Sequence, residues 1–369
     1  MDKMNKTVPT RKPSIERAVV NHPGSIIAFE LDARGWTQKD LAAIVQRPAQ
    51  AINEIINGKK RITAETAYAL ASALGINEEI WLRLESNYQL YISRQNVKQH
   101  EIARRSALFS FAPILEMIRR GWLKNIDNKT ETLESSIEEF YGSKIPQLSP
   151  YLPQLRFRLS ENRTPEEYAK LAWVIQVYHL AKKDKVAQFN LNNLDKLIED
   201  LLELTKHPKQ VTMVKPKLEE YGIHFILLEH LSKSYIDGAT FYLDDNPVVA
   251  LTLRFDRLDY FWFTLMHELA HIKLGHTEGH IDDSLESNDT TKDEIEASEV
   301  AGNWLIEESK LEKFLTDSRN LDKATIDLFA ESILRHPSIV IGRLHNRKIL
   351  SYSKMRDHIP KVKHFLPME

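Results

Sequence analysis

The sequence has no cysteine among its 369 residues. This absence excludes disulfide bonds, a cysteine nucleophile, iron–sulfur clusters and thiolate zinc sites. A metal site in this chain therefore has to be built from histidine and carboxylate side chains. The formal net charge is only −2, so the chain as a whole is not a polycation. Any nucleic-acid site must be a local one.

Long apolar runs are missing as well. No apolar stretch approaches the roughly 18 residues needed to span a bilayer. Residues 1–20 are basic and polar, without the apolar core of a signal peptide. We therefore expect a protein that has no membrane partner and is located in the cytoplasm.

What is present is an ordinary globular composition, with 42% apolar and 28% charged residues. A chain of this length is expected to form two or three domains. The pattern predicts a flexible basic arm over 1–21, short helices over 22–92, a helical connecting region over 93–215, and strands followed by helices over 216–369. The predicted fold class is mainly α with a small β-sheet.

The expected elements of the later segments follow from hydrophobic periodicity and turn residues. In the connecting region they are helices at Ala107–Arg120, Leu133–Tyr141, Pro165–Ala181 and Leu191–Leu204. In the last segment they are β-rich runs at 222–231 and 238–254, a hairpin turn at 244–247, two helices separated by a loop at 276–293, and a short β-like run at 339–341.

The first candidate site lies in the segment of short helices. Thr37 is a residue type that caps helix N-termini, and the apolar spacing predicts a helix over 38–45. A break at 46–48 separates it from a second helix over about 49–56. Two short helices joined by such a turn form a helix-turn-helix pattern, in which the second helix enters a DNA groove.

The polar residues of this segment have the chemistry that DNA recognition needs. Glutamine and asparagine on the second helix can pair with adenine edges, and basic residues just after it can contact phosphates. A plain helical bundle with solvated polar faces is the alternative. The residues that we predict to bind DNA are Thr37, Gln38, Gln50, Asn53, Lys59, Lys60 and Arg61.

The segment also resembles the HigA-type antitoxin branch of the XRE repressors. The resemblance rests on the runs His22-Pro23-Gly24, Trp36-Thr37-Gln38-Lys39-Asp40-Leu41-Ala42, Ile55-Ile56-Asn57-Gly58-Lys59 and Ile62-Thr63-Ala64-Glu65-Thr66-Ala67. It implies an all-α helix-turn-helix head that binds double-stranded operator DNA as a homodimer. It also implies a protein associated with the nucleoid.

The second candidate site is the run His267-Glu268-Leu269-Ala270-His271. On a helix, residues four apart lie on one face, so both imidazoles can reach one zinc ion. Glu268 is then placed to activate a water on the metal as the catalytic base. A chance pair of histidines is the alternative. A β-rich stretch just upstream favours the zinc site, because zinc peptidases hold an extended substrate along an edge strand.

A third metal ligand is available on the helix that follows. Ala297, Ala301 and Leu305 mark its buried side, and Glu294 lies one turn before Ala297. Glu296 is rotated from Glu294 by roughly 200°. The predicted ligands are therefore His267, His271 and Glu294, with Glu296 in reserve.

Two further histidines compete for this role. The long metzincin pattern places a glycine at position 274 and a histidine at position 277, whereas this chain has Gly275 and His276. This shift by one residue turns the donor of His276 away from the metal, so we expect His276 to support the site. His280 is the other competitor.

Residues 215–345 resemble the ImmA/IrrE family of metallopeptidases. The resemblance rests on IDGATFYLDDNPVVALTLR, DYFWFTLMHELAHIKLGH and EIEASEVAGNWLI. In the last run, Ser298 and Val300 replace residues that are more often Asn and Phe in the family. The resemblance implies an α+β zincin-like domain over 216–369. His345 and Arg343 lie in a closing segment, where we expect structural roles.

Such family members are associated with cleavage of regulatory proteins. The resemblance therefore implies a DNA-binding regulator with a zinc-dependent endopeptidase domain, whose protein substrate is a repressor, a toxin-like partner or the chain itself. The alternative is a HigA-like antitoxin or repressor whose peptidase-like domain is a non-catalytic scaffold for sensing or partner binding.

Overall fold

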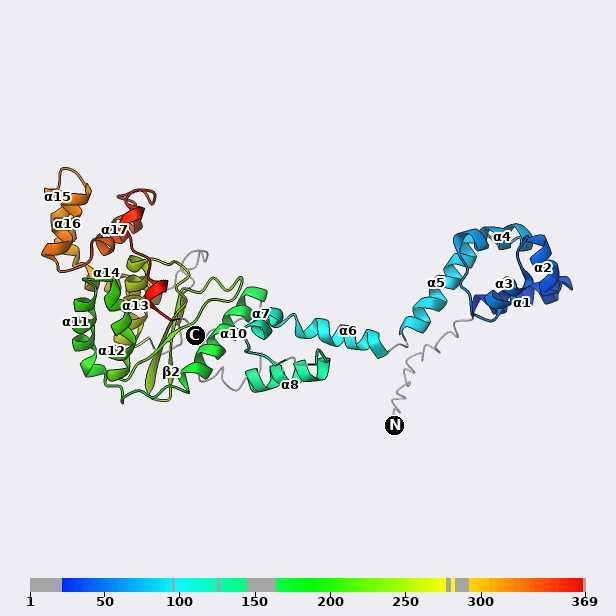
Figure 1. Cartoon of the computed structure of the whole chain (residues 1–369), viewed down its shortest axis with the longest axis horizontal. Coiled ribbons are helices and arrows are strands. Elements are labelled where there is room, and N and C mark those ends of the chain that lie inside the picture. The colour runs from blue at the N-terminus through cyan, green and yellow to red at the C-terminus, as the bar shows by residue number, and fades with distance from the viewer. Residues whose placement is uncertain are drawn as a thin grey trace, which may run out of the picture. The chain divides into compact units, whose positions relative to one another are not determined.

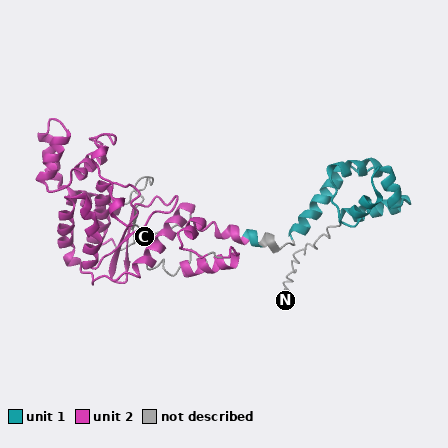
Figure 2. Ribbon diagram, in the orientation of Figure 1, with its two compact units in different colours: residues 1–103 teal, residues 104–369 magenta. Residues whose placement is uncertain are grey.

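The structure is a computed structural model that describes residues 22–94, 97–124, 127–144, 164–276, 280–282 and 292–367, with side chains for all of these except 97–100 and 280–282. The predicted basic arm and most of the predicted loop at 276–293 lie outside the described residues. The chain divides into unit 1, residues 1–103, and unit 2, residues 104–369 (Figure 2). Helices dominate both units and a small sheet lies in unit 2 (Figure 1), which confirms the predicted fold class.

Unit 1 is helical throughout its described part. Its helices are α1 (Pro23–Arg34), α2 (Gln38–Ile44), α3 (Ala49–Ile56), α4 (Ala64–Leu74), α5 (Glu78–Arg94) and the first residues of α6 (Val97–Leu108). They enclose one apolar core, to which each of α1 to α5 contributes; its largest side chain is the fully buried Trp81. The helices predicted over 38–45 and 49–56 are α2 and α3.

Local signals explain where α2 begins. The Thr37 hydroxyl accepts a hydrogen bond from the Asp40 N–H, and the Asp40 carboxylate accepts one from the Thr37 N–H at 2.7 Å. This reciprocal pair is a capping box, which satisfies two otherwise free donors of the first turn. The hydrogen bond from the Thr37 backbone also lowers the pKa of Asp40.

Unit 2 contains most of the helices and the four described strands. Its α-helices after α6 are α7 (Ile114–Arg119), α8 (Thr130–Tyr141), α10 (Pro165–Ala181), α11 (Leu194–Leu204), α12 (Val214–Glu220), α13 (Leu258–Leu274), α14 (Lys292–Leu305), α15 (Glu308–Asp317), α16 (Lys323–Ser332) and α17 (Pro337–Asn346). Short 3-10 helices are η2 (Leu191–Asn193), η3 (Pro208–Met213), η4 (Arg356–His358) and η5 (Lys363–Phe365). The strands are β1 (His224–Leu227), β2 (Gly238–Leu243), β3 (Asn246–Leu251) and β4 (His280–Asp282).

The sheet has the strand order β1-β3-β2-β4. β1 runs parallel to β3, whereas β2 is antiparallel to both β3 and β4. The predicted hairpin turn is present, because β2 ends at Leu243, β3 begins at Asn246, and Asp244 between them has a φ of 53°. Aspartate tolerates this left-handed conformation better than most residues.

Helices pack on both faces of the sheet. Successive side chains of a strand point to opposite faces, so each strand contributes to two cores. Phe225 and Val249 face the core formed with α11 to α14 and α17. Ile226 and Val248 face the core formed with α7, α8 and α10. Helix α10, from the predicted connecting region, thus packs directly against the sheet.

Three details differ from the sequence expectations. Ile339–Ile341 lies inside α17 and not in a strand; His336 caps this helix and Pro337 starts it, and a short apolar run alone does not distinguish a strand from a buried helix. The helix predicted at Ala107–Arg120 is divided into the end of α6 and α7, with Pro113 just before α7. Among the described residues, the outer neighbour of β2 is β4, downstream of α13, so β2 is not itself an edge strand along Gly238–Thr240.

Among the described helices, none combines the length and apolar character needed to cross a membrane.

Candidate functional site

The polar surface of unit 1 is formed by the start of α2 and the exposed side of α3. The Asn53 Nδ2 atom donates a hydrogen bond to Gln38 Oε1 at 3.0 Å, which links the two helices. A surface hollow of about 540 Å³ lies here, lined by Thr37, Gln38, Lys39, Ala49, Gln50 and Asn53. Four of the residues predicted to bind DNA are therefore brought together around one hollow.

The basic residues follow directly after α3. Lys59, Lys60 and Arg61 are exposed, and the N–H groups of both lysines donate to the Glu54 carbonyl oxygen at 2.7 and 3.1 Å. These bonds hold the basic turn to the end of the helix. The sequence prediction did not include Lys39, which lines the same hollow. Its position directly after Gln38 in the sequence could have indicated this role.

The far end of α3 is held by the start of α1. Gly24 lies so close to α3 that an added Cβ atom would be 2.3 Å from the carbonyl oxygen of Ile56. His22 Nδ1 accepts a hydrogen bond from the Gly24 N–H at 2.9 Å. The same ring faces Gly58, where an added Cβ atom would be 2.9 Å from Nε2. The run His22-Pro23-Gly24 therefore packs against the end of the predicted DNA-reading helix.

The candidate metal centre lies between α13 and α14 in unit 2. The Nε2 atoms of His267 and His271 are 3.1 Å apart. Glu294 Oε2 lies 3.0 Å from His267 Nε2, and Glu294 Oε1 lies 3.6 Å from His271 Nε2. His267 and His271 are 3% and 0% exposed. Three side chains, two of them buried and that of Glu294 partly buried, thus converge on one point.

These distances fit a zinc ion. Zinc takes nitrogen and oxygen ligands at about 2.0–2.2 Å in tetrahedral geometry, which separates neighbouring ligand atoms by about 3.3 Å. The two Nε2 atoms are 3.1 Å apart, and each lies 3.0 to 3.6 Å from one of the two Glu294 oxygens. Two imidazoles and a carboxylate are also the donor set of known catalytic zinc sites.

Glu268 is held between α13 and β2. Its Oε2 atom accepts a hydrogen bond from the Thr240 hydroxyl at 2.6 Å, and the residue is fully buried. Gly238 leaves room for the carboxylate, because an added Cβ atom there would be 2.3 Å from Glu268 Oε1. The sequence prediction did not include Thr240 or Gly238, both of which β2 brings next to the metal helix.

The outer nitrogens of the two histidines also have neighbours. His267 Nδ1 lies 3.2 Å from Ser298 Oγ on α14. His271 Nδ1 lies 2.9 Å from His276 Nδ1 in the turn after α13. The expectation that His276 does not join the ligand cluster agrees with this arrangement, and Ser298 is a contact that the sequence prediction missed.

Comparisons with known proteins agree with this division into two sites. Residues 27–81 match the family profile described as Helix-turn-helix, and residues 218–331 match the profile described as IrrE N-terminal-like domain. Virulence-associated protein I of Dichelobacter nodosus is 33% identical over 76 residues, which cover 20% of this chain and 70% of that protein. The chain belongs to the XRE-type helix-turn-helix family and carries an IrrE N-terminal-like domain.

Other relatives match about the same share of this chain. Virulence-associated protein A' of Dichelobacter nodosus is 37% identical over 70 residues, or 19% of this chain, and the match spans 61% of that protein. A solved structure, an addiction module antidote protein of the HigA family from Coxiella burnetii, is 35% identical, with a TM-score of 0.19. That match covers 20% of this chain and 80% of the Coxiella chain.

Within unit 2, the remaining predicted residues lie as follows. Glu296 is exposed on α14, and the side chain of His280 lies outside the described residues. His345 is buried, with Nε2 2.9 Å from the Lys354 carbonyl oxygen. Arg343 packs against Gly302, where an added Cβ atom would be 2.4 Å from its guanidinium. The last two contacts are structural, as expected.

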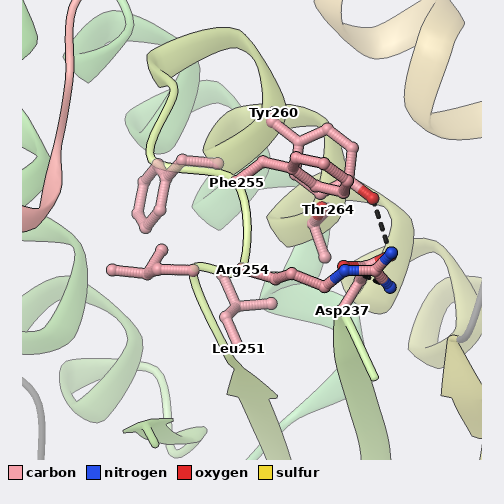
Figure 3. Close-up of a pocket in the computed structure, with 8 residues that line it drawn as sticks. Asp237, Leu251, Arg254, Phe255, Tyr260 and Thr264 are labelled. Carbon is pink, nitrogen blue, oxygen red and sulfur yellow. Dashed lines mark hydrogen bonds and ion pairs between the residues drawn. The ribbon is translucent and has the colours of Figure 1, made fainter. Parts of the chain in front are cut away.

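The same unit has a small cavity of about 10 Å³ between α13, the start of β2 and the end of β3 (Figure 3). The Tyr260 hydroxyl donates to Asp237 Oδ2 at 2.7 Å, and Arg254 lies 4.0 Å from the other oxygen of this fully buried carboxylate. The cavity has room for about one water molecule. It is therefore too small for a substrate, and its residues support the fold.

Proposed function

We propose that this protein is a transcription regulator whose helix-turn-helix domain binds operator DNA and whose IrrE N-terminal-like domain is a zinc-dependent endopeptidase. The observation that carries the peptidase half is the convergence of the buried His267 and His271 with Glu294 on one point, with the buried Glu268 on the helix of the two histidines. The substrate is a regulatory protein, namely a repressor, a toxin-like partner or a copy of this chain. The regulator binds DNA as a homodimer at the nucleoid.

In this proposal, His267, His271 and Glu294 hold the zinc ion. Zinc bound there would supply an acidified water and a polarised peptide carbonyl group. Glu268 would act as the base that accepts a proton and delivers it to the amine nitrogen as the peptide C–N bond breaks. Thr240 orients the Glu268 carboxylate for both transfers, because its hydroxyl is bound to Oε2.

The DNA half of the proposal rests on the hollow between α2 and α3. Asn53 reads a base edge while Gln38 supports its amide. Lys39, Lys59, Lys60 and Arg61 contact phosphates on either side of this reading position. The close approach of Gly24 to the Ile56 carbonyl oxygen fixes the packing of α3, the helix that carries Asn53, against α1.

Metal analysis followed by a cleavage assay tests the peptidase half. Wild type purified without chelator should contain one zinc per chain and cleave a candidate regulator protein. Glu268→Gln should keep the zinc and lose cleavage, whereas His271→Asn should lose both. A wild type free of zinc would refute the metal site. Equal cleavage by wild type and Glu268→Gln would refute the role of Glu268.

A wild type that binds zinc but cleaves none of the candidate proteins favours the second reading, a repressor with a non-catalytic scaffold. The cleavage assay then needs to include this chain and the products of genes beside its own, because these are the regulators it would meet first.

A titration with the protein's own promoter tests the DNA half. Affinity should fall steeply with salt, because each phosphate contact releases counterions. Asn53→Ala should relax sequence preference by about 1–3 kcal/mol, and Lys59→Ala should reduce the salt slope by about 1. Glu79→Gln, on the exposed start of α5, is the control. Binding that is insensitive to salt and to both variants would contradict the assignment.

A further inference from the structure

The two metal-binding histidines are contacted at both of their ring nitrogens. Their Nε2 atoms converge with Glu294, whereas each Nδ1 atom faces a side chain from another part of the fold. An imidazole that binds a metal through Nε2 must carry its proton on Nδ1. Each Nδ1–H group therefore needs an acceptor, and the identity of that acceptor decides how well the ring is held.

Helix α14 holds His267 at both nitrogens. Glu294 Oε2 lies 3.0 Å from His267 Nε2, and Ser298 Oγ lies 3.2 Å from His267 Nδ1. Glu294 and Ser298 are four residues apart, so they lie on one face of the same helix. The Ser298 hydroxyl can accept a hydrogen bond from the Nδ1–H group, which keeps the proton on Nδ1 and leaves the Nε2 lone pair directed at the metal position.

The turn after α13 holds His271. Gly275 ends the helix with a φ of 70°, and the His276 N–H then donates to the His271 carbonyl oxygen at 3.0 Å. This reversal places His276 Nδ1 2.9 Å from His271 Nδ1. Because His271 donates, His276 Nδ1 must accept, and His276 must carry its own proton on Nε2. That nitrogen faces Asp293 Oδ1 at 3.9 Å.

The geometry points to Ser298 and His276 as positioning residues that fix the tautomer and the ring orientation of His267 and His271. This inference rests on the metal site proposed above. The inference explains why His276 comes one residue too early to be a ligand. At this position its ring folds back onto the Nδ1 side of His271.

Zinc affinity of the full chain tests this inference without an activity assay. Competition with a chromogenic chelator should show that Ser298→Ala and His276→Leu each weaken zinc binding about 10- to 100-fold, as loss of such partners does at other zinc sites. Ser298→Thr keeps a hydroxyl and should bind zinc more tightly than Ser298→Ala. His276→Gln keeps an acceptor and should bind zinc more tightly than His276→Leu. Glu299→Gln, exposed on the same helix, is the matched control and should bind like wild type.

The outcomes separate this inference from the proposed function. A wild type that does not bind zinc refutes the metal site. A wild type that binds zinc, with Ser298→Ala and His276→Leu binding equally well, refutes the positioning roles and leaves the metal site standing. Should either variant fail to fold, Ser298→Gly or His276→Ala, which also lacks the acceptor, replaces it: a 10-fold or larger loss of affinity relative to Ser298→Thr or His276→Gln supports the inference, and a smaller loss contradicts it.

Discussion

The two units present their functional side chains in opposite ways. In unit 1, Thr37, Gln50 and Asn53 are exposed on short helices. In unit 2, Glu268 and His271 are fully buried between α13, α14 and the sheet. A protein that reads DNA must offer its polar groups to a macromolecule. A metal centre must remove its ligands from water and hold them by contacts from several elements.

This difference predicts how far folding and function can be separated in each unit. Exposed residues of α2 and α3 can be changed with little effect on stability, because they contribute few packing contacts. The candidate ligands His267 and His271 lie on the same buried helix as the core residues Leu265 and Leu269. There, function and stability should change together.

Removal of zinc should have the largest effect and should be confined to unit 2. A ligand that binds only the folded state stabilises it by about 4 kcal/mol when its free concentration is roughly 1,000-fold above Kd. Chelation should therefore increase hydrogen exchange in α13 and α14 and leave α1 to α4 unchanged, as measured by mass spectrometry. A uniform response of both units, or none, would break the comparison.

Gly24→Ala should have the next largest effect, and it marks the exception within unit 1. The new Cβ atom would meet the carbonyl oxygens of Ile56 and Ile55 at 2.3 and 2.7 Å, so α1 and α3 must separate. We expect unit 1 to lose about 3 kcal/mol of stability, together with DNA affinity. Gly75→Ala is the control: it has a φ of 73° but open space around it, so about 1 kcal/mol is expected. Equal denaturation midpoints for the two variants would contradict the packing argument.

Gly238→Ala should cost unit 2 about 2 kcal/mol. The added Cβ atom would lie 2.3 Å from Glu268 Oε1 and 3.1 Å from Thr264 Cγ2, so the carboxylate has to move from its position beside Thr240. Thermal denaturation measures the stability loss, and cleavage should fall while zinc content stays the same. Gly275→Ala, where nothing lies within 4 Å, should spare the orientation of Glu268. Unchanged cleavage by Gly238→Ala would separate β2 from the chemistry.

The candidate site of unit 1 could be predicted from the sequence more completely than that of unit 2, because its signals are local. The signals for α2 and α3 are a capping residue, apolar spacing and a turn, all within about 20 residues of one another. Asn53 could be assigned to the exposed side of α3 from spacing alone. Its hydrogen bond to Gln38 could not, because it depends on the angle between the two helices.

In unit 2, helical periodicity was enough to pair His267 with His271. It also favoured Glu294 over Glu296, and the structure has Glu294 at the cluster with Glu296 exposed. Thr240 and Ser298 were missed because they contact α13 across 28 and 31 residues of chain. Such contacts arise when β2 and α14 pack on α13, and no local pattern specifies them.

The smallest predicted effect compares two helix caps within unit 1. Thr37 caps α2 and Thr63 caps α4, each accepting a hydrogen bond from the N–H three residues later. Thr37→Ala and Thr63→Ala should each cost about 1 kcal/mol of stability, measured by chemical denaturation. Thr37 lines the hollow with Gln38 and Asn53, whereas Thr63 is not among the residues around it. Only Thr37→Ala should therefore weaken binding to the promoter, in a titration at a temperature where both variants are folded. If the two variants bind alike, the face made by α2 and α3 does not meet DNA through its capped end, and the basic turn at Lys59 has to provide the contact instead.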